Sequence, residues 1–207
     1  MAGRSIDERG RGDERGQAHT LEAFTAALIV VSGVLFALQS TAVTPLTAST
    51  SNQHIENQHQ VAAADLLAGA AERGTLRQSV LFWDQTNGTF VGASESGFYA
   101  NSGPPNAFGE SLNETFGSFS SPGRRIAYNV YVYYRKPDNT SRRQTMVYMG
   151  SPSDNAATAS RTVTIYDDTP LNGTETNVSS GRFYAPDAAP NATLYNTMEV
   201  RIVVWQM

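Results

Sequence analysis

The stretch Leu21–Val43 is the feature that most restricts how this chain folds. It is almost wholly apolar or small, and no lysine or arginine occurs between Gly16 and Arg73. A helix of about 20 residues is about 30 Å long, enough to cross the hydrocarbon core of a bilayer. A buried helix of a soluble protein would need neighbours on every side, which the rest of the chain hardly supplies. The stretch therefore predicts one transmembrane helix within residues 17–46.

Basic residues predict the orientation of this helix. Residues 1–16 are charged and glycine-rich without an apolar pattern, which predicts a disordered cytoplasmic tail or a signal that is removed. Arginines flank the helix on its N-terminal side only, so the tail lies inside the cell and the C-terminal domain outside. We therefore predict a single-pass protein of the cell membrane. The arginines are Arg4, Arg9, Arg11 and Arg15.

The sequence leaves three fates open for the apolar segment. It can be an uncleaved anchor. It can be an ordinary secretory signal, because Ser40-Thr41-Ala42 is an acceptable small-x-small cleavage site. It can also be a class III signal, from which the charged tail is removed while the helix is kept.

Composition argues against several classes of function. The chain has no cysteine, which excludes disulfides and thiolate metal sites. A net charge of −4 argues against a nucleic-acid partner. His19, His54 and His59 are not spaced to share a metal ion and are predicted to be solvated. Asp167 and Asp168 lack the regular spacing of a calcium loop and predict a turn. With no nucleophile motif or phosphate loop either, we predict no enzyme activity and no cofactor.

Helices are predicted on both sides of Gly74. Residues 47–74 form a stem in which the run 60–71 strongly favours helix and Gly74 ends it. Thr75–Trp83 adds a further helical turn or two, because Leu76, Val80 and Trp83 are spaced for one face. Asn106–Phe116 predicts a short helix.

Antiparallel strands follow. Ile126–Tyr134 alternates as a half-buried strand and forms a hairpin with Gln144–Met149 across the Lys136–Asn139 turn. Arg161–Tyr166 and Met198–Gln206 predict two more strands. The fold class is therefore α+β: a long N-terminal transmembrane and stem helix, followed over residues 75–207 by a small antiparallel sheet outside the cell. Met198, Val200, Ile202 and Val204 are predicted to share the buried face of the last strand.

Polar side chains suggest two kinds of surface site. Tyrosines crowd the first long strand behind Arg124 and Arg125; cross-strand packing is the favoured interpretation, with ligand binding as the alternative. Asn-x-Ser/Thr sequences predict N-glycosylation of an exposed surface, and chance occurrence in threonine-rich loops is the alternative. The tyrosines are Tyr128, Tyr131, Tyr133 and Tyr134. The sequons are Asn87, Asn113, Asn139, Asn172, Asn177 and Asn191.

The N-terminal segment also resembles a known family. Arg15-Gly16-Gln17 before an apolar helix resembles the processing site of archaeal prepilins, and the run GQAHTLEAFTAALIVVSGVLFALQSTAVTPLTAST resembles haloarchaeal type IV pilin-like proteins of unassigned role. The resemblance implies cleavage after Gly16 and a pilin-like fold. It also implies a role in assembly for Glu22, near the new N-terminus. A position at headgroup depth is the other interpretation of this carboxylate.

Small residues on the apolar helix favour close helix contacts. Gly33 and Ala37 form a small-xxx-small pair, which lets helices approach each other in lipid. We expect a type IV pilin-like subunit, a minor component of a surface filament or secretion-like assembly. Its partners would be the membrane and either further copies of itself or other pilin-like subunits. The alternative is a monomeric, membrane-anchored surface module that binds a partner or ligand.

Overall fold

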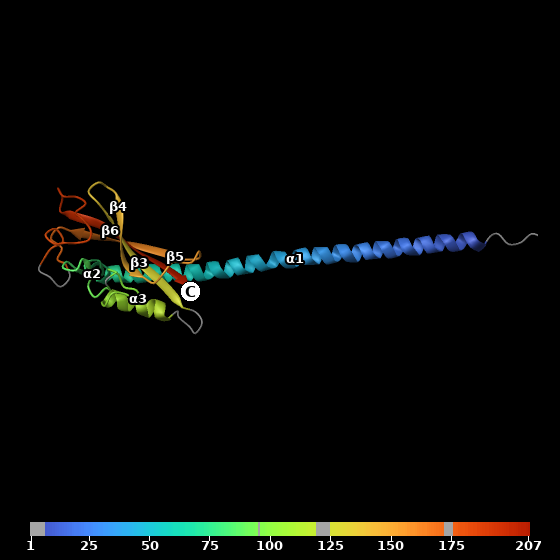
Figure 1. The fold of residues 1–207 in the computed structure, drawn as a ribbon, viewed down its shortest axis with the longest axis horizontal. Helices are drawn as coiled ribbons and strands as arrows, with labels where there is room; N and C mark the ends of the chain where they lie inside the picture. Colours follow the sequence, from blue (N-terminus) through green and yellow to red (C-terminus); the bar gives the residue numbers. More distant parts are fainter. Residues whose placement is uncertain (1–6, 95, 119–124, 172–175) are drawn as a thin grey trace, which may run out of the picture. The chain divides into compact units, whose positions relative to one another are not determined.

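The computed structural model describes the backbone of residues 7–94, 96–118, 125–171 and 176–207, without the side chains of residues 7–18, 39–52 and 118. The chain forms two compact units, Met1–Asn52 and Gln53–Met207, and each has its own architecture (Figure 1). The fold is α+β, with an N-terminal apolar helix followed by antiparallel sheets, which confirms the predicted class at that level.

The described part of the first unit is helical throughout. Helix α1 (Asp7–Glu72) begins within the charged segment for which the sequence predicted no structure. That prediction is wrong for residues 7–16. Once a helix exists, each added residue gains one hydrogen bond without the cost of a new nucleus. Arginine and glutamate are also good helix formers, so the apolar helix can extend through them.

In the second unit, α1 ends where glycine permits a left-handed conformation. Gly74 has φ 74° and its N–H donates to the carbonyl of Ala71 at 3.1 Å. Such a residue just beyond the last helical turn is a common helix stop. The end of α1 at Glu72 confirms the helix predicted over residues 60–71 and its termination by Gly74.

Two short helices follow, both predicted. Helix α2 spans Thr75–Val80 and helix α3 spans Ala107–Ser118. Asn106 is the N-cap of α3: its side-chain oxygen accepts hydrogen bonds from the N–H groups of Phe108 and Gly109 at 3.1 and 3.2 Å. These two N–H groups have no partner inside the helix, so the cap explains where α3 begins.

A two-stranded hairpin was not predicted. Strand β1 (Trp83–Asp84) pairs with β2 (Thr89–Phe90). Trp83 was expected on the face of a helix; it lies in β1 instead, still buried, with its Nε1–H donating to the carbonyl of Arg182 at 2.9 Å. The missed signal is Asn87-Gly88, a dipeptide typical of tight hairpins.

The main sheet has four antiparallel strands in the order β4-β3-β6-β5. All four strands were predicted, but three begin three or four residues earlier than expected. The missed residues are polar in β4, small in β5 and mixed in β6, so no clear apolar alternation marks them. The strands are β3 (Ile126–Arg135), β4 (Ser141–Tyr148), β5 (Ala157–Tyr166) and β6 (Leu194–Gln206).

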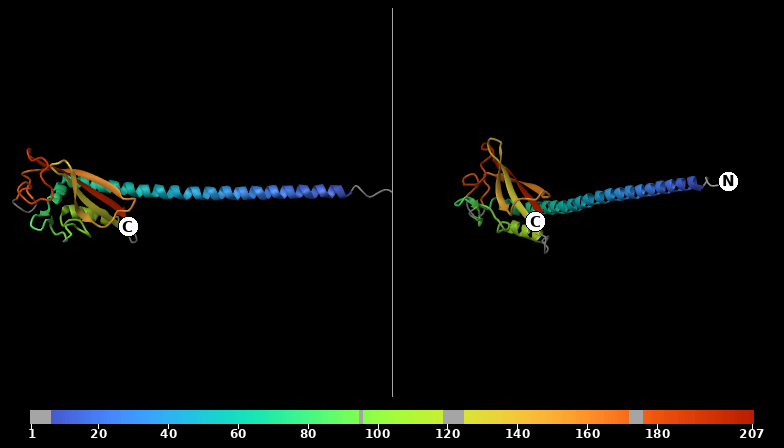
Figure 2. Two further views of the ribbon diagram at one scale, coloured as in Figure 1. Left: turned by 45° about the horizontal axis from the view of Figure 1, so that its top comes forward. Right: turned by 45° about the vertical axis from the view of Figure 1, so that its right-hand side comes forward.

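One face of this sheet carries the core of the second unit. The C-terminal part of α1 and helix α3 cover that face (Figures 1 and 2). The alternating residues of β6 that were predicted to be buried are all fully buried, which confirms the register of that strand. The core includes Leu66 and Leu67 of α1, Phe108, Leu112 and Phe116 of α3, and Met198, Val200, Ile202 and Val204 of β6.

Strand β3 is buried on both faces, so the prediction of a half-buried strand is wrong. Residues 127–132 are buried without alternation. The reason is the connection from β4 to β5, which must cross from one edge of the sheet to the other. It starts over Asn129, whose side chain donates to the carbonyl of Gly150 and accepts from the N–H of Met149. The connection thereby covers one end of the face opposite the helices.

Candidate functional site

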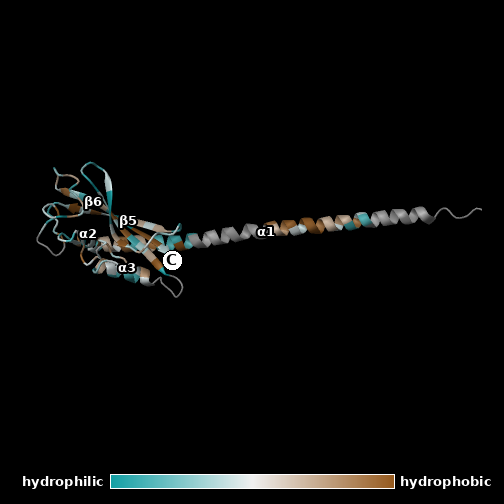
Figure 3. Ribbon diagram, in the orientation of Figure 1, coloured by the Kyte–Doolittle hydropathy of each residue, from teal (hydrophilic) through white to brown (hydrophobic). Residues whose placement is uncertain are grey.

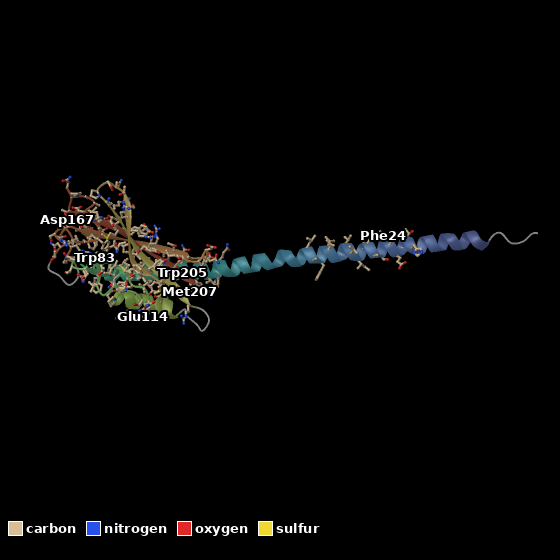
Figure 4. The ribbon with its side chains drawn as sticks, viewed as in Figure 1. Phe24, Trp83, Glu114, Asp167, Trp205 and Met207 are labelled. Atoms are coloured by element: carbon tan, nitrogen blue, oxygen red, sulfur yellow. The ribbon has the colours of Figure 1, made fainter. Side chains whose placement is uncertain are left out.

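The apolar segment of α1 is the largest exposed hydrophobic surface that the structure describes. His19–Leu38 is 20 residues long, has a mean hydropathy of 2.2 and is not buried at all. Ten large apolar side chains are between 52% and 76% exposed, including Phe24 (Figure 4), and they form a continuous band (Figure 3). Moving a side chain of this size fully out of water is worth about 1.5 kcal/mol or more, so the band favours contact with lipid or protein. By length and composition it is compatible with a membrane anchor or a signal peptide.

The residues predicted to act in helix assembly lie on this segment. The Glu22 carboxylate is 3.8 Å from Nδ1 of His19, one turn earlier, and both side chains are more than 80% exposed. A Cβ atom added at Gly33 would meet nothing within 4 Å, and Ala37 lies one turn later on the same side. Neither the carboxylate nor the small-residue face is covered by the described residues of this chain.

The predicted processing residues precede the apolar segment. Arg15, Gly16 and Gln17 lie within α1. Their side chains are outside the described residues, so the processing site remains a prediction from the sequence.

The predicted glycosylation sites differ in accessibility. Asn87, Asn113, Asn139 and Asn191 are exposed, and Asn177 is half-buried beside Pro170; Asn172 lies outside the described residues. Three of the exposed side chains take part in local hydrogen bonds. Asn87 donates to Asp84, Asn113 accepts from Tyr128, and Asn139 accepts from Arg135. Asn191 lies in a loop. Among the exposed sequons it alone has no hydrogen bond to its side chain within the described residues.

The sheet face opposite the helices is polar and aromatic; we call it the outer face. Arg143 lies over the ring of Tyr131, and Arg201 over the ring of Tyr133, each at 4.4 Å from the ring centre. Arg201 also pairs with Glu199 at 2.9 Å, and this hydrogen bond lowers the pKa of the carboxylate. By strand register, the polar and aromatic part of the outer face comprises Tyr131, Tyr133, Arg135, Ser141, Arg143, Thr145, Thr158, Ser160, Thr162, Thr164, Thr197, Glu199 and Arg201, and Ala127, Asn129, Val203 and Trp205 complete the face.

The four predicted tyrosines are divided between the two faces. Tyr128 and Tyr134 belong to the core side, where Tyr128 contacts Phe116 with ring centres 5.2 Å apart. Tyr131 and Tyr133 lie together on the outer face. Packing therefore accounts for the first pair, while the second pair forms a surface with arginine. Arg124 is outside the described residues.

His59 is buried, contrary to the prediction that all three histidines are solvated. It is 6% exposed and lies on the buried face of α1, one turn before Ala63. Burial lowers the pKa of this imidazole, because removing the charged form from water is costly. A histidine among alanines and polar residues gives no periodic apolar signal, so the sequence could not place it in the interior.

We expect the stability of the full-length protein to fall as the pH drops below the ordinary histidine pKa of 6.5. The folded pKa is lower, so the unfolded chain binds a proton first and the equilibrium shifts toward unfolding. This contribution is complete above pH 6.5 and is lost as the pH falls to the folded pKa. His59→Gln should flatten the loss between pH 7.5 and 5, measured by thermal unfolding in detergent. His54→Gln, at an exposed position, should leave the slope unchanged; equal slopes in all three proteins would contradict the argument.

Two acidic residues considered for calcium binding lie in a turn, as predicted. Asp167 and Asp168 follow β5 directly, and one carboxylate oxygen of Asp167 (labelled in Figure 4) is buried without a hydrogen bond among the described residues. Across the described ranges, no three His, Asp or Glu side chains are placed to hold a metal ion.

Comparison with known proteins gives one match. The model of a family of unknown function, DUF7288, matches residues 15–204. No curated protein and no solved structure matches the chain.

Proposed function

The chain belongs to DUF7288, a family of unknown function, and we propose that it is a type IV pilin-like subunit of a cell-surface filament. In this proposal, a peptidase removes the cytoplasmic tail after Gly16. The apolar helix first anchors the subunit in the membrane and then packs against the helices of other subunits. The second unit lies outside the cell.

The observation that carries this proposal is the exposed apolar band directly behind Arg15-Gly16-Gln17. A signal peptide that is cut off needs no further apolar contacts, and a monomeric anchor needs only lipid. A subunit that leaves the membrane must cover the same ten large side chains with protein, since their exposure to water is unfavourable. Gly33 and Ala37 supply the close approach that such helix packing requires.

The architecture of the second unit supports the same role. Its sheet buries one face against the C-terminal part of α1, so the stem and the sheet form one core.

Processing gives the first test. Gly16→Leu should prevent cleavage, because a bulky side chain replaces the residue before the scissile bond. The mature protein should then retain residues 1–16, measured as an increase in intact mass after purification from its own cells. Gly12→Leu makes the same change four residues earlier and should leave processing intact. If the unaltered protein begins at Met1 or Ala2, the proposal loses its main support.

One observation favours a second candidate, a monomeric membrane-anchored binding module. The outer face has a hollow of about 210 Å³, bordered by Tyr133, Arg135, Thr162 and Glu199. An aromatic ring beside charged and hydroxyl groups suits a polar ligand such as a sugar. In that case the mature chain would keep its cytoplasmic tail and remain a monomer in the membrane.

A further inference from the structure

The two sides of the second unit differ in charge. The outer face carries Arg135, Arg143 and Arg201 and a single carboxylate, Glu199, whereas Arg142 and Arg161 pair with core-side residues. The opposite side, which we call the helix layer, consists of α1 from Gln53 onward together with α3. These two helical segments themselves have no lysine or arginine, although the Arg73 guanidinium, directly after α1, lies beside Gly69; four of their carboxylates are exposed. The exposed acids are Asp65, Glu72, Glu110 and Glu114.

These acids have no ionic partner among the described residues of their own chain. The ion pairs of the described ranges are His19–Glu22, Lys136–Asp138 and Arg201–Glu199. Glu110 and Glu114 lie one turn apart on α3 (Figure 4 labels Glu114), where like charges at this spacing disfavour the helix. A cation from another molecule would relieve this repulsion.

The outer face presents such a cation in a fixed position. The Arg143 guanidinium lies over the ring of Tyr131, with its Cζ 4.4 Å from the ring centre, and this contact restricts its side-chain freedom. A planar guanidinium donates two parallel hydrogen bonds to a carboxylate. Arg135 lies on the same face, two residues beyond the Tyr133 that pairs with Arg143. Glu199 neutralises Arg201, so Arg135 and Arg143 leave the outer face with a net positive charge.

We propose that the outer face of one copy binds the helix layer of the next copy. Contact between two outer faces, or between two helix layers, would oppose like charges, so the interface is heterologous. A heterologous contact that does not close into a ring generates a filament. This proposal rests on the filament function proposed above and names the surfaces through which the extracellular units meet.

Cysteine cross-linking tests which surfaces meet, because the chain has no cysteine of its own. Thr164 is exposed on the outer face and Ala107 is exposed at the start of α3. Thr164→Cys and Ala107→Cys therefore place one thiol on each surface. Full-length copies carrying one change each, with different tags, are produced in the same cells and treated with a cysteine-specific cross-linker. The mixed pair should cross-link at least fivefold more than either variant with itself. Equal or greater cross-linking of Thr164→Cys with itself would overturn the proposal.

Charge reversal tests the attraction. Arg143→Glu makes the outer face acidic, and the double variant Glu110→Arg, Glu114→Arg makes the helix layer basic. Each variant alone should reduce cross-linking between the outer face and the helix layer about tenfold. Produced together, the two variants should regain it, since an acidic outer face then meets a basic helix layer. Recovery would also show that both variants fold. Thr162→Glu adds an acid to the outer face without removing a contact and should act like Arg143→Glu.

A third cysteine separates this proposal from the filament function. Ala26→Cys lies on the Gly33 side of the apolar helix and should cross-link to itself in any assembly that packs these helices. If Ala26→Cys cross-links but the charge-reversed mixture shows no recovery, the outer-face contact is wrong and the filament function stands. If no pair cross-links, both proposals fail.

Discussion

Gly33→Leu is expected to abolish incorporation of the subunit into filaments while leaving its insertion into the membrane unchanged. In lipid, apolar helices gain little from hydrophobicity alone, so association depends on how closely the backbones approach. Leucine at position 33 would hold neighbouring helices apart. It also makes the segment more apolar, which favours insertion.

The geometry of the chain makes this substitution informative. A Cβ at position 33 meets nothing within 4 Å, so the change disturbs no contact within the described chain. Glycine is also a poor residue in the middle of a helix, and leucine is a good one. Any loss of assembly must therefore arise between chains.

Ala27→Leu is the matched control for this prediction. It adds a leucine to the same segment about a third of a turn away from the Gly33 face, and filaments should retain it. The measurement is the amount of each variant in sheared filaments relative to the membrane fraction. If Gly33→Leu enters filaments as well as the unaltered chain does, this face does not carry assembly. If the unaltered chain appears only as a monomer, the binding module becomes the better function.

Strong periodic or compositional signals predicted most of the fold. The run 60–71 and Gly74 located the stem and its end, and the alternation of Met198 to Val204 located β6 and its buried face. The start of β5 was missed because its first residues are small and polar and lie at an edge of the sheet. The burial of β3 was missed because it depends on the strand order β4-β3-β6-β5. That order sends a connection over Asn129, and it is a long-range property that no local pattern carries.

The candidate sites also differ in whether the sequence alone could predict them. The apolar band was predictable from residues 21–43 alone, since it needs no tertiary contact. The outer face was not predictable, because Arg143 and Tyr131 meet only through the pairing of β3 with β4, and Arg201 and Tyr133 only through the pairing of β3 with β6. His59 carried no signal at all. Its burial follows from its position on the side of α1 that faces the sheet.

A second large effect is expected from Gly109→Ala in α3. A Cβ atom at this position would overlap the backbone carbonyl of Pro104. The contact is also close at Gly103, where an added Cβ would lie 2.7 Å from the Cα of Gly109. Backbone atoms cannot rotate away as a side chain can, so α3 must shift. The shift would pull Phe108 and Leu112 out of the core and disturb the Asn106 cap.

The cost of Gly109→Ala should be about 3 kcal/mol, the upper part of the usual range for overpacking. For a folded unit of this size, that corresponds to a fall in Tm of about 10 °C. Gly117→Ala is the matched control on the same helix, because a Cβ there meets nothing within 4 Å. It should stabilise the protein by about 0.5 kcal/mol, since alanine restricts the unfolded chain and favours helix. Thermal unfolding of the full-length protein in detergent measures both. Stability changes of opposite sign would establish the close approach of Pro104 to α3. Equal changes would show that helix propensity alone determines the effect on stability.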